Sequence, residues 1–162
     1  MKVLVTVGSR HGASDEIGAA VRAALNDAGI ETEQVAPEQV TSLDAYDAVV
    51  IGSGVYAGRW VDSARRFVDE HLDELRAKPV WLFSSGPLGE PPKPDEEPAE
   101  GAEVAARVGA REHRVFAGNL DRDKLNFGER VIVGLVKAPY GDFRSWPTIN
   151  AWGGTIARTL RS

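Results

Sequence analysis

A short run of small polar residues follows the first apolar stretch of the chain and has the composition of a phosphate-binding loop. Gly8 and Gly12 bracket the donor-rich sequence Ser-Arg-His, and the run closes on a second serine, Ser14. Hydroxyl groups and backbone N–H groups at the start of a helix bind a phosphate dianion without a metal ion. An ordinary capped turn between a strand and a helix uses the same residue types, so this run alone leaves both interpretations open.

Two later apolar stretches end in residues of the same kind. The chain reads Gly-Ser-Gly at 52–54 and Ser-Ser-Gly at 84–86, each directly after a β-branched or aromatic run. In open α/β sheets, ligands bind beyond the carboxyl ends of the strands. Three such endings predict one shared site at a single sheet edge, and they favour phosphate binding over a simple turn at 8–14.

The loop at 8–14 lacks the signatures of the commonest nucleotide sites. No Gly-Lys-Ser/Thr follows it, which excludes a P-loop, and it has no G-x-G-x-x-G fingerprint for a dinucleotide. A phosphate-accepting receiver domain needs acidic residues here to hold a divalent cation, and the first strand ends in Gly8 and Ser9 instead. The loop therefore predicts metal-free contact with a phosphate.

The composition excludes several other kinds of site. The 162 residues include no cysteine, which removes disulfides, thiolate zinc sites, iron–sulfur ligation and thiol catalysis. The three histidines, His11, His71 and His113, are scattered, so no metal site is predicted and the last two are interpreted as surface or structural histidines. A net charge of −5 argues against a nucleic-acid partner. No acid–base residue stands out, so no catalytic residue is assigned.

Apolar periodicity places these loops between alternating strands and helices. Short β-branched runs predict strands, and apolar residues three or four apart predict helices. Strands are predicted at 3–7, 31–35, 47–54, 78–86 and 113–120. Helices are predicted at 14–29, 59–77, 104–109 and 149–160, the first with Ser14 as its N-cap and Gly29 at its end.

This order of elements predicts an α/β fold with a mostly parallel sheet covered on both faces. The length favours one domain over 1–162. The acidic, Pro-rich stretch at 89–103 is predicted to be a mobile solvated loop, or alternatively a lid near the site. No apolar run reaches the roughly 18 residues needed to span a bilayer, and the N-terminus carries no targeting pattern. We therefore expect a cytoplasmic protein with no transmembrane segment.

The run Ser-Arg-His-Gly-Ala-Ser resembles the flavodoxin phosphate loop in its shorter Ser-x-x-Gly-x-Ser/Thr form. The resemblance implies a flavodoxin-like three-layer sandwich whose five-stranded parallel sheet has the order 2-1-3-4-5. It also implies FMN as the cofactor, with the phosphate on the first loop and the isoalloxazine ring at the ends of the third and fourth strands. The cofactor-binding residues that it implies are Ser9, Arg10, His11, Gly12, Ala13, Ser14, Ser53, Gly54, Val55, Tyr56, Ala57, Gly58, Ser84, Ser85, Gly86, Pro87 and Leu88.

Four aromatic residues are candidates either for the flavin site or for the core. Tyr56 is interpreted as a ring contact, because aromatic faces pack well against one another. Trp60 stays open between ring contact and core packing. Trp146 and Trp152, in or just before the last helix, are predicted to belong to the core.

A second resemblance concerns the kind of flavoprotein. The stretches GSGVYAGRW and GDFRSWPTINAW are similar to flavodoxin-domain proteins grouped with the quinone-linked, oxygen-independent protoporphyrinogen oxidases. That subfamily has an extra, partly apolar segment before its last helix, and the candidate here is 123–143. The resemblance implies a protoporphyrinogen dehydrogenase that passes electrons to a quinone. An apolar stripe on this segment predicts core packing or a subunit contact, with peripheral membrane contact as the alternative.

Three other functions stay open at this stage. The chain could be a flavodoxin-type electron carrier that meets a partner reductase, or a reductase that draws on a nicotinamide. It could also be a flavodoxin fold without flavin that serves as a binding module. The substrate or redox partner and the oligomeric state are left unassigned.

Overall fold

Five parallel strands form the centre of the computed structural model, which describes residues 1–9, 12–56, 59–85, 99–116, 119–120, 141–142 and 146–161. The strands are β1 (Lys2–Gly8), β2 (Glu31–Gln34), β3 (Ala48–Tyr56), β5 (Val80–Ser85) and β6 (Glu112–Phe116), in the order β2-β1-β3-β5-β6. The predicted order 2-1-3-4-5 is confirmed, because it counts the same five strands. A short additional strand, β4 (Arg59–Trp60), pairs antiparallel with the end of β3 and makes the sheet six-stranded.

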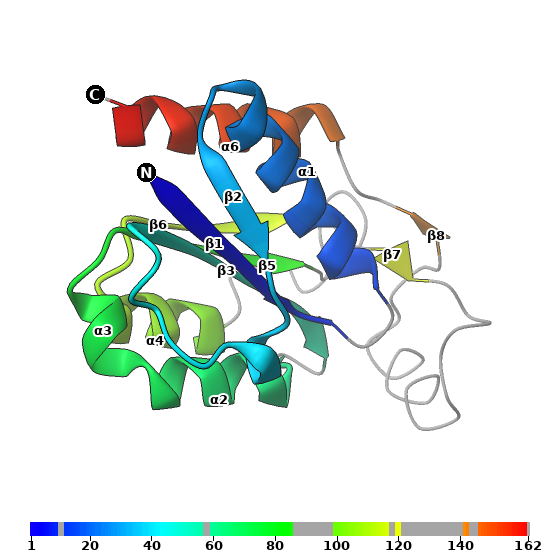
Figure 1. Cartoon of the computed structure of the whole chain (residues 1–162). Helices are drawn as coiled ribbons and strands as arrows, with labels where there is room; N and C mark the ends of the chain where they lie inside the picture. The colour runs from blue at the N-terminus through cyan, green and yellow to red at the C-terminus, as the bar shows by residue number, and fades with distance from the viewer. Residues whose placement is uncertain are drawn as a thin grey trace.

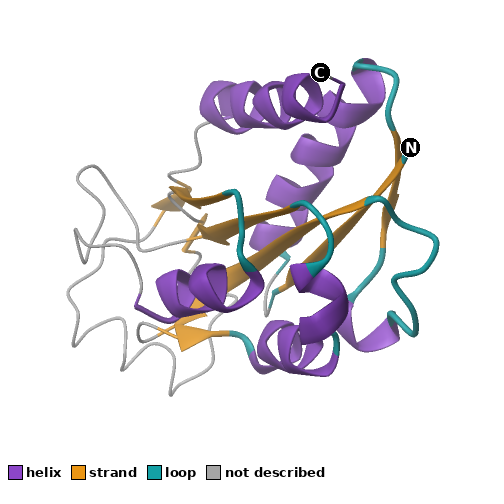
Figure 2. Cartoon of the chain, turned by 90° about the vertical axis from the view of Figure 1, so that its left-hand side faces the viewer, coloured by secondary structure: helices purple, strands orange, loops and turns teal. Residues whose placement is uncertain are grey.

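Helices cover both faces of this sheet, as Figures 1 and 2 show. Helices α1 (Ala13–Asp27) and α6 (Trp146–Arg161) pack on one face, and α2 (Asp62–Glu70), α3 (Leu72–Arg76) and α4 (Ala99–Val108) pack on the other. Strand alternation sorts the core accordingly. In β1, Val5 joins the cluster under α1 and α6, whereas its neighbour Leu4 joins the cluster under α2 and α4.

Two glycines with positive φ bound helix α1. Gly12 is its N-cap at φ 86°, so the prediction that Ser14 caps the helix is wrong: Ser14 is the second helical residue. The left-handed turn at Gly12 brings the chain into the helix two residues earlier than the polar pattern indicated. At the other end Gly29 has φ 84°, and the N–H groups of Gly29 and Ile30 donate to the carbonyls of Asn26 and Leu25. This is a Schellman motif, and it confirms Gly29 as the end of the helix.

The continuous helix predicted for 59–77 is wrong. The first two residues form strand β4, Val61 is the N-cap of α2, and a break at His71 separates α2 from α3. His71 has φ −117° and ψ 20°, outside the helical range, and its ring packs on Phe67 with centroids 4.9 Å apart. The apolar spacing that predicted one helix is kept by two short helices that both pack on the sheet.

Other element boundaries also differ from the prediction. Helix α4 begins at Ala99, so the end of the predicted acidic loop is helical, and its residues 89–98 lie outside the described residues. The strand predicted for 113–120 is two strands, β6 and β7 (Asn119–Leu120). Strand β7 pairs antiparallel with β8 (Gly141–Asp142), which is the only described part of the predicted insertion at 123–143. A short 3-10 helix (Pro37–Gln39) follows β2.

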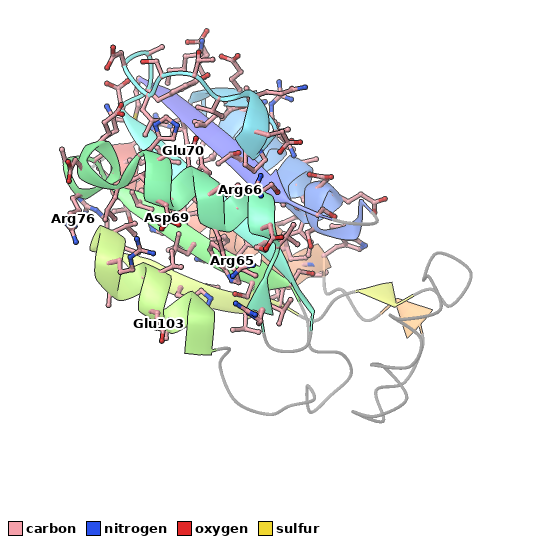
Figure 3. The ribbon with its side chains drawn as sticks, turned by 90° about the horizontal axis from the view of Figure 1, so that it is seen from below. Arg65, Arg66, Asp69, Glu70, Arg76 and Glu103 are labelled. Carbon is pink, nitrogen blue, oxygen red and sulfur yellow. The ribbon has the colours of Figure 1, made fainter. Side chains whose placement is uncertain are left out.

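Charged side chains cover the outside of the α2–α4 layer (Figure 3). The guanidinium of Arg107 in α4 lies 2.7 Å from the Asp69 carboxylate of α2, and Arg76 of α3 donates to the Arg107 carbonyl. These contacts join the three helices at their solvent side. No helix in the described part of the chain has the length and apolar character to cross a membrane.

Candidate functional site

The three small polar strand endings meet at one edge of the sheet, as predicted. Gly8 of β1 is in register with Ser53 of β3, and Ser53 is in register with Ser84 of β5. This row of three residues, the end row, lies across the centre of the sheet at its carboxyl edge. The loops that follow β1, β3 and β5 therefore start side by side, at the place where parallel α/β sheets bind ligands.

The first loop presents the start of helix α1 to this edge. The Ser9 hydroxyl accepts a hydrogen bond from the Gly12 N–H at 2.9 Å, and the Gly12 carbonyl accepts one from Glu16. Apart from Gly12 itself and its chain neighbours, no atom of the described residues lies within 4 Å of the position that a Gly12 Cβ would take, so none of these residues closes the space beside the turn. The first turn of α1, which includes the 4% exposed Ser14, follows directly. Arg10 and His11 lie outside the described residues.

Gly8 is required by the close approach of a second helix. A Cβ at Gly8 would lie 2.9 Å from the Ala64 Cβ and 3.3 Å from the Ala64 backbone nitrogen. The Ala64 nitrogen is part of the backbone of helix α2, which cannot move aside as a flexible side chain could. The first turns of α1 and α2 thus both lie at the end of β1.

The second loop begins with a serine whose side chain is already used. Ser53 is fully buried, and its hydroxyl accepts a hydrogen bond from the Val61 N–H at 2.9 Å while donating to the Gly54 carbonyl at 2.8 Å. Val61 directly follows the β3–β4 hairpin, so Ser53 fixes the base of that hairpin to the sheet. Tyr56 pairs with Arg59 in the hairpin, and Ala57 and Gly58 between them lie outside the described residues. Ring stacking by Tyr56 stays a prediction.

A hydrogen-bond chain, the Trp60–Ser84–His113 network, links the hairpin strand β4 to the ends of β5 and β6. The Trp60 indole N–H donates to the Ser84 hydroxyl at 2.9 Å, and the same oxygen lies 2.8 Å from His113 Nε2. Trp60 is 2% exposed and Ser84 is fully buried, which answers the open question for Trp60 in favour of the core. Sequence reasoning did not find this network, since its members lie 24 and 29 residues apart.

The remaining aromatic and histidine predictions are confirmed. Trp152 is 1% exposed, and Trp146 is partly buried against the same core cluster. The Trp152 indole donates to the Glu112 carboxylate at 2.7 Å. His113 is part of the network above, and His71 packs between α2 and α3 with Glu74 3.4 Å from its Nδ1. Of the third loop, Ser85 is buried, and Gly86, Pro87 and Leu88 lie outside the described residues.

Shifted pKa values are found at two carboxyl groups, those of Asp15 and Glu33, and at the Tyr46 hydroxyl. Partial burial raises the pKa of Asp15 in the first turn of α1, and the negative charge of Glu38 raises it further. At the opposite edge of the sheet, a hydrogen bond from Lys2 lowers the pKa of Glu33, and Tyr46 also donates to this carboxylate. Burial, followed by Glu33, raises the pKa of Tyr46. Of these groups, Asp15 is the one beside the candidate site.

Comparisons with known proteins give the family and the fold. The sequence model of the family described as "Flavodoxin domain" matches residues 4–145. No curated protein matches the chain. A flavodoxin from the domain Archaea is 17% identical with a TM-score of 0.67, and each chain covers 100% of the other. A cysteine-to-serine mutant of flavodoxin from Pseudomonas aeruginosa is also 17% identical, with a TM-score of 0.66 and 100% of both chains covered.

A third structure shares the fold as part of a longer enzyme. Rubredoxin oxygen:oxidoreductase from Desulfovibrio gigas is 14% identical with a TM-score of 0.63, over 99% of this chain and 36% of that one. At these identities, the three likenesses establish the fold alone.

Proposed function

The chain belongs to the flavodoxin domain family, and on this premise we propose that it binds FMN noncovalently and acts in electron transfer or as an oxidoreductase. One observation carries the proposal. The end row of Gly8, Ser53 and Ser84 brings three loops to the carboxyl edge of the sheet, and the first of them leads into an open turn at the start of α1.

The residues at the first loop fit a phosphate monoester. The left-handed Gly12 turns the chain so that the first backbone N–H groups of α1 face outward from the helix start, where an anion is stabilised. Ser9 holds the turn through the Gly12 N–H, and its hydroxyl and that of Ser14 add further donors. The proposal places the FMN phosphate here, with Ser9–Ser14 around it.

At the second and third loops, the side chains of Ser53 and Ser84 are not available to a ligand. Both hydroxyls are buried and already have protein partners. The proposal therefore assigns contact with the isoalloxazine ring to backbone groups and to the residues that follow, Val55–Gly58 and Ser85–Leu88. When bound, the flavin supplies the electron or hydride transfer, while the protein orients the ring and limits solvent access.

The sequence resemblance favours one more specific candidate, a protoporphyrinogen dehydrogenase that uses a quinone. Two of the aromatic residues in the resembling stretches, Trp60 and Trp152, are buried and hydrogen-bonded in the core. Core packing accounts for these two positions without a substrate. We therefore propose the general redox role first. Assays of quinone reduction and porphyrinogen oxidation by the flavin-loaded protein test the more specific candidate.

Titration of the purified apoprotein with FMN tests the proposal. We expect one-to-one quenching of flavin fluorescence, and Ser9→Ala should weaken binding about five-fold, as for the loss of one hydrogen bond. Ser42→Ala is the matched control, because the Ser42 hydroxyl also accepts a backbone N–H in a turn, from Asp44 at 3.1 Å, but away from this edge. No binding at tens of micromolar FMN would overturn the proposal and favour a binding module.

A further inference from the structure

The Trp60–Ser84–His113 network runs directly beneath two of the loops at the candidate site. We propose that Trp60 and His113 are positioning residues, which act through Ser84 to hold the β3–β4 hairpin and the end of β5 at the spacing that the flavin ring needs. The inference rests on the proposed function. It adds residues that lie outside the predicted set of cofactor-binding positions.

The network joins three segments that the sequence keeps apart. Trp60 is the last residue of the hairpin strand β4, Ser84 stands next to the end of β5, and His113 is the second residue of β6. Helix α4 closes over the network at Gly101, where a Cβ would lie 2.5 Å from the His113 Cε1 and 3.0 Å from the Ser84 Oγ. The network thus lies between three strands and one helix.

The donor and acceptor inventory fixes the direction of the first bond. An indole N–H can only donate, so the Ser84 oxygen accepts from Trp60. The tautomer of His113 sets the direction of the second bond, because the Ser84 hydroxyl can either donate to Nε2 or accept from it. Because Trp60 and Ser84 are buried, loss of either partner leaves a polar group without water to replace it.

The position of the network explains why it bears on ligand binding. The hairpin turn at 57–58 and the loop after Ser85 are the two segments to which the proposal assigns the ring. The hairpin base is fixed separately by the Ser53 bond to Val61, so the Trp60 bond is a second attachment, directed at β5. With both in place, Trp60 and the end of β5 are held at a fixed spacing before a ligand binds, which lowers the cost of binding.

Trp60→Phe tests the attachment with little change in shape, and Trp152→Phe is its matched control. Each substitution removes an indole N–H from a tryptophan that is at most 2% exposed, one bonded to Ser84 and the other to Glu112. We expect both proteins to fold with similar loss of stability. Trp60→Phe should weaken FMN binding about five-fold, and Trp152→Phe should change it less than about two-fold.

Ser84→Ala provides a second variant that creates less empty space. It removes both bonds of the network, and we expect about ten-fold weaker FMN binding. The double variant Trp60→Phe with Ser84→Ala should bind FMN no more weakly than Ser84→Ala alone. The hydrogen bond that Trp60→Phe removes is already absent in Ser84→Ala. Fully additive effects would show that Trp60 and Ser84 act independently and would overturn the network.

Riboflavin, which lacks the phosphate, separates the ring from the phosphate end. If the network positions the loops at the flavin ring, Trp60→Phe and Ser84→Ala should each weaken riboflavin and FMN binding by the same factor. Ser9→Ala should weaken the binding of FMN alone. Weakening confined to FMN, or equal effects of Trp60→Phe and Trp152→Phe, would overturn the inference while leaving the proposed function intact. If the wild-type protein bound neither flavin, the proposed function would fail and the inference with it.

Discussion

Two adjacent glycines in helix α6 offer a sharp test of the packing between α6 and α1. Gly153 and Gly154 both lie in the interior of the helix, so replacement of either by alanine brings the same gain in helix propensity, about 1 kcal/mol. Their surroundings differ. Among the described residues outside its own helix backbone, a Cβ at Gly154 would meet only the Arg158 guanidinium, at an ordinary 3.6 Å, whereas a Cβ at Gly153 would lie 2.7 Å from the Ala24 Cβ of α1.

The cost at Gly153 follows from that distance. Carbon atoms in contact prefer about 3.5–4.0 Å, so the two helices must separate by roughly 1 Å at this point. The Val21 carbonyl oxygen at 3.3 Å and Cα at 3.4 Å belong to backbone, which cannot rotate away. Overpacking of this kind costs about 1–3 kcal/mol. The difference between the two variants should therefore be about 1–3 kcal/mol, because the propensity gain is common to both.

Urea unfolding of the wild type and both variants measures this difference directly. We expect Gly154→Ala to raise the free energy of unfolding by about 1 kcal/mol, equivalent to roughly 2–4 °C in Tm for a chain of this size. The free energy of unfolding of Gly153→Ala should equal the wild-type value or lie below it. If the two variants were equally stable within about 0.5 kcal/mol, the close approach of the helices at Gly153 would not limit packing, and the reasoning would be refuted.

The remaining predictions concern a buried hydroxyl and two carboxylates. Thr6 is fully buried and its Oγ1 has no hydrogen-bond partner among the described residues, so Thr6→Val should raise the free energy of unfolding by about 1 kcal/mol, and a loss of stability would show that the hydroxyl is bonded. The pKa of Asp15 is raised above its ordinary 3.8, chiefly by burial, so between 3.8 and the raised pKa the folded protein binds more protons here than the unfolded chain does. Its contribution to stability therefore falls as the pH rises from about 3.8 through the folded-state pKa, and Asp15→Asn should remove this fall from the curve of unfolding free energy against pH. The pKa of Glu33 is lowered from 4.5 by the Lys2 hydrogen bond, so its contribution is present above 4.5 and is lost as the pH falls through the lowered pKa. Glu33→Gln should reduce the loss of stability in acid, and an unchanged acid limb would contradict the assignment.

The central strands could be predicted because their signals are local, whereas the order of the strands in the sheet followed from the resemblance to flavodoxins. Strands β1, β3 and β5 each contain a short apolar run, and Gly29 marks the end of α1 in the sequence itself. The start of α1 was misplaced because a serine side chain and a left-handed glycine can both begin a helix. Only the backbone angle at Gly12 distinguishes them.

The site was harder to predict because its side-chain directions depend on distant partners. Ser53 and Ser84 have the residue types of ligand contacts, yet both hydroxyls turn inward to Val61 and Trp60. Trp60 fitted a helical period with the residues after it, although its pairing with Val55 in a hairpin takes it out of the helix. Strands buried on both faces carry no alternation that would reveal which way a serine points.

The end row of Gly8, Ser53 and Ser84 also has a consequence for hydrogen exchange. Strands β1, β3 and β5 are paired on both sides and buried under helices, so their backbone amide protons exchange with solvent only when the sheet itself opens. The edge strand β2, with its partly exposed residues and one neighbour, opens at lower free energy. The candidate site therefore stands on the slowest-exchanging part of the described structure.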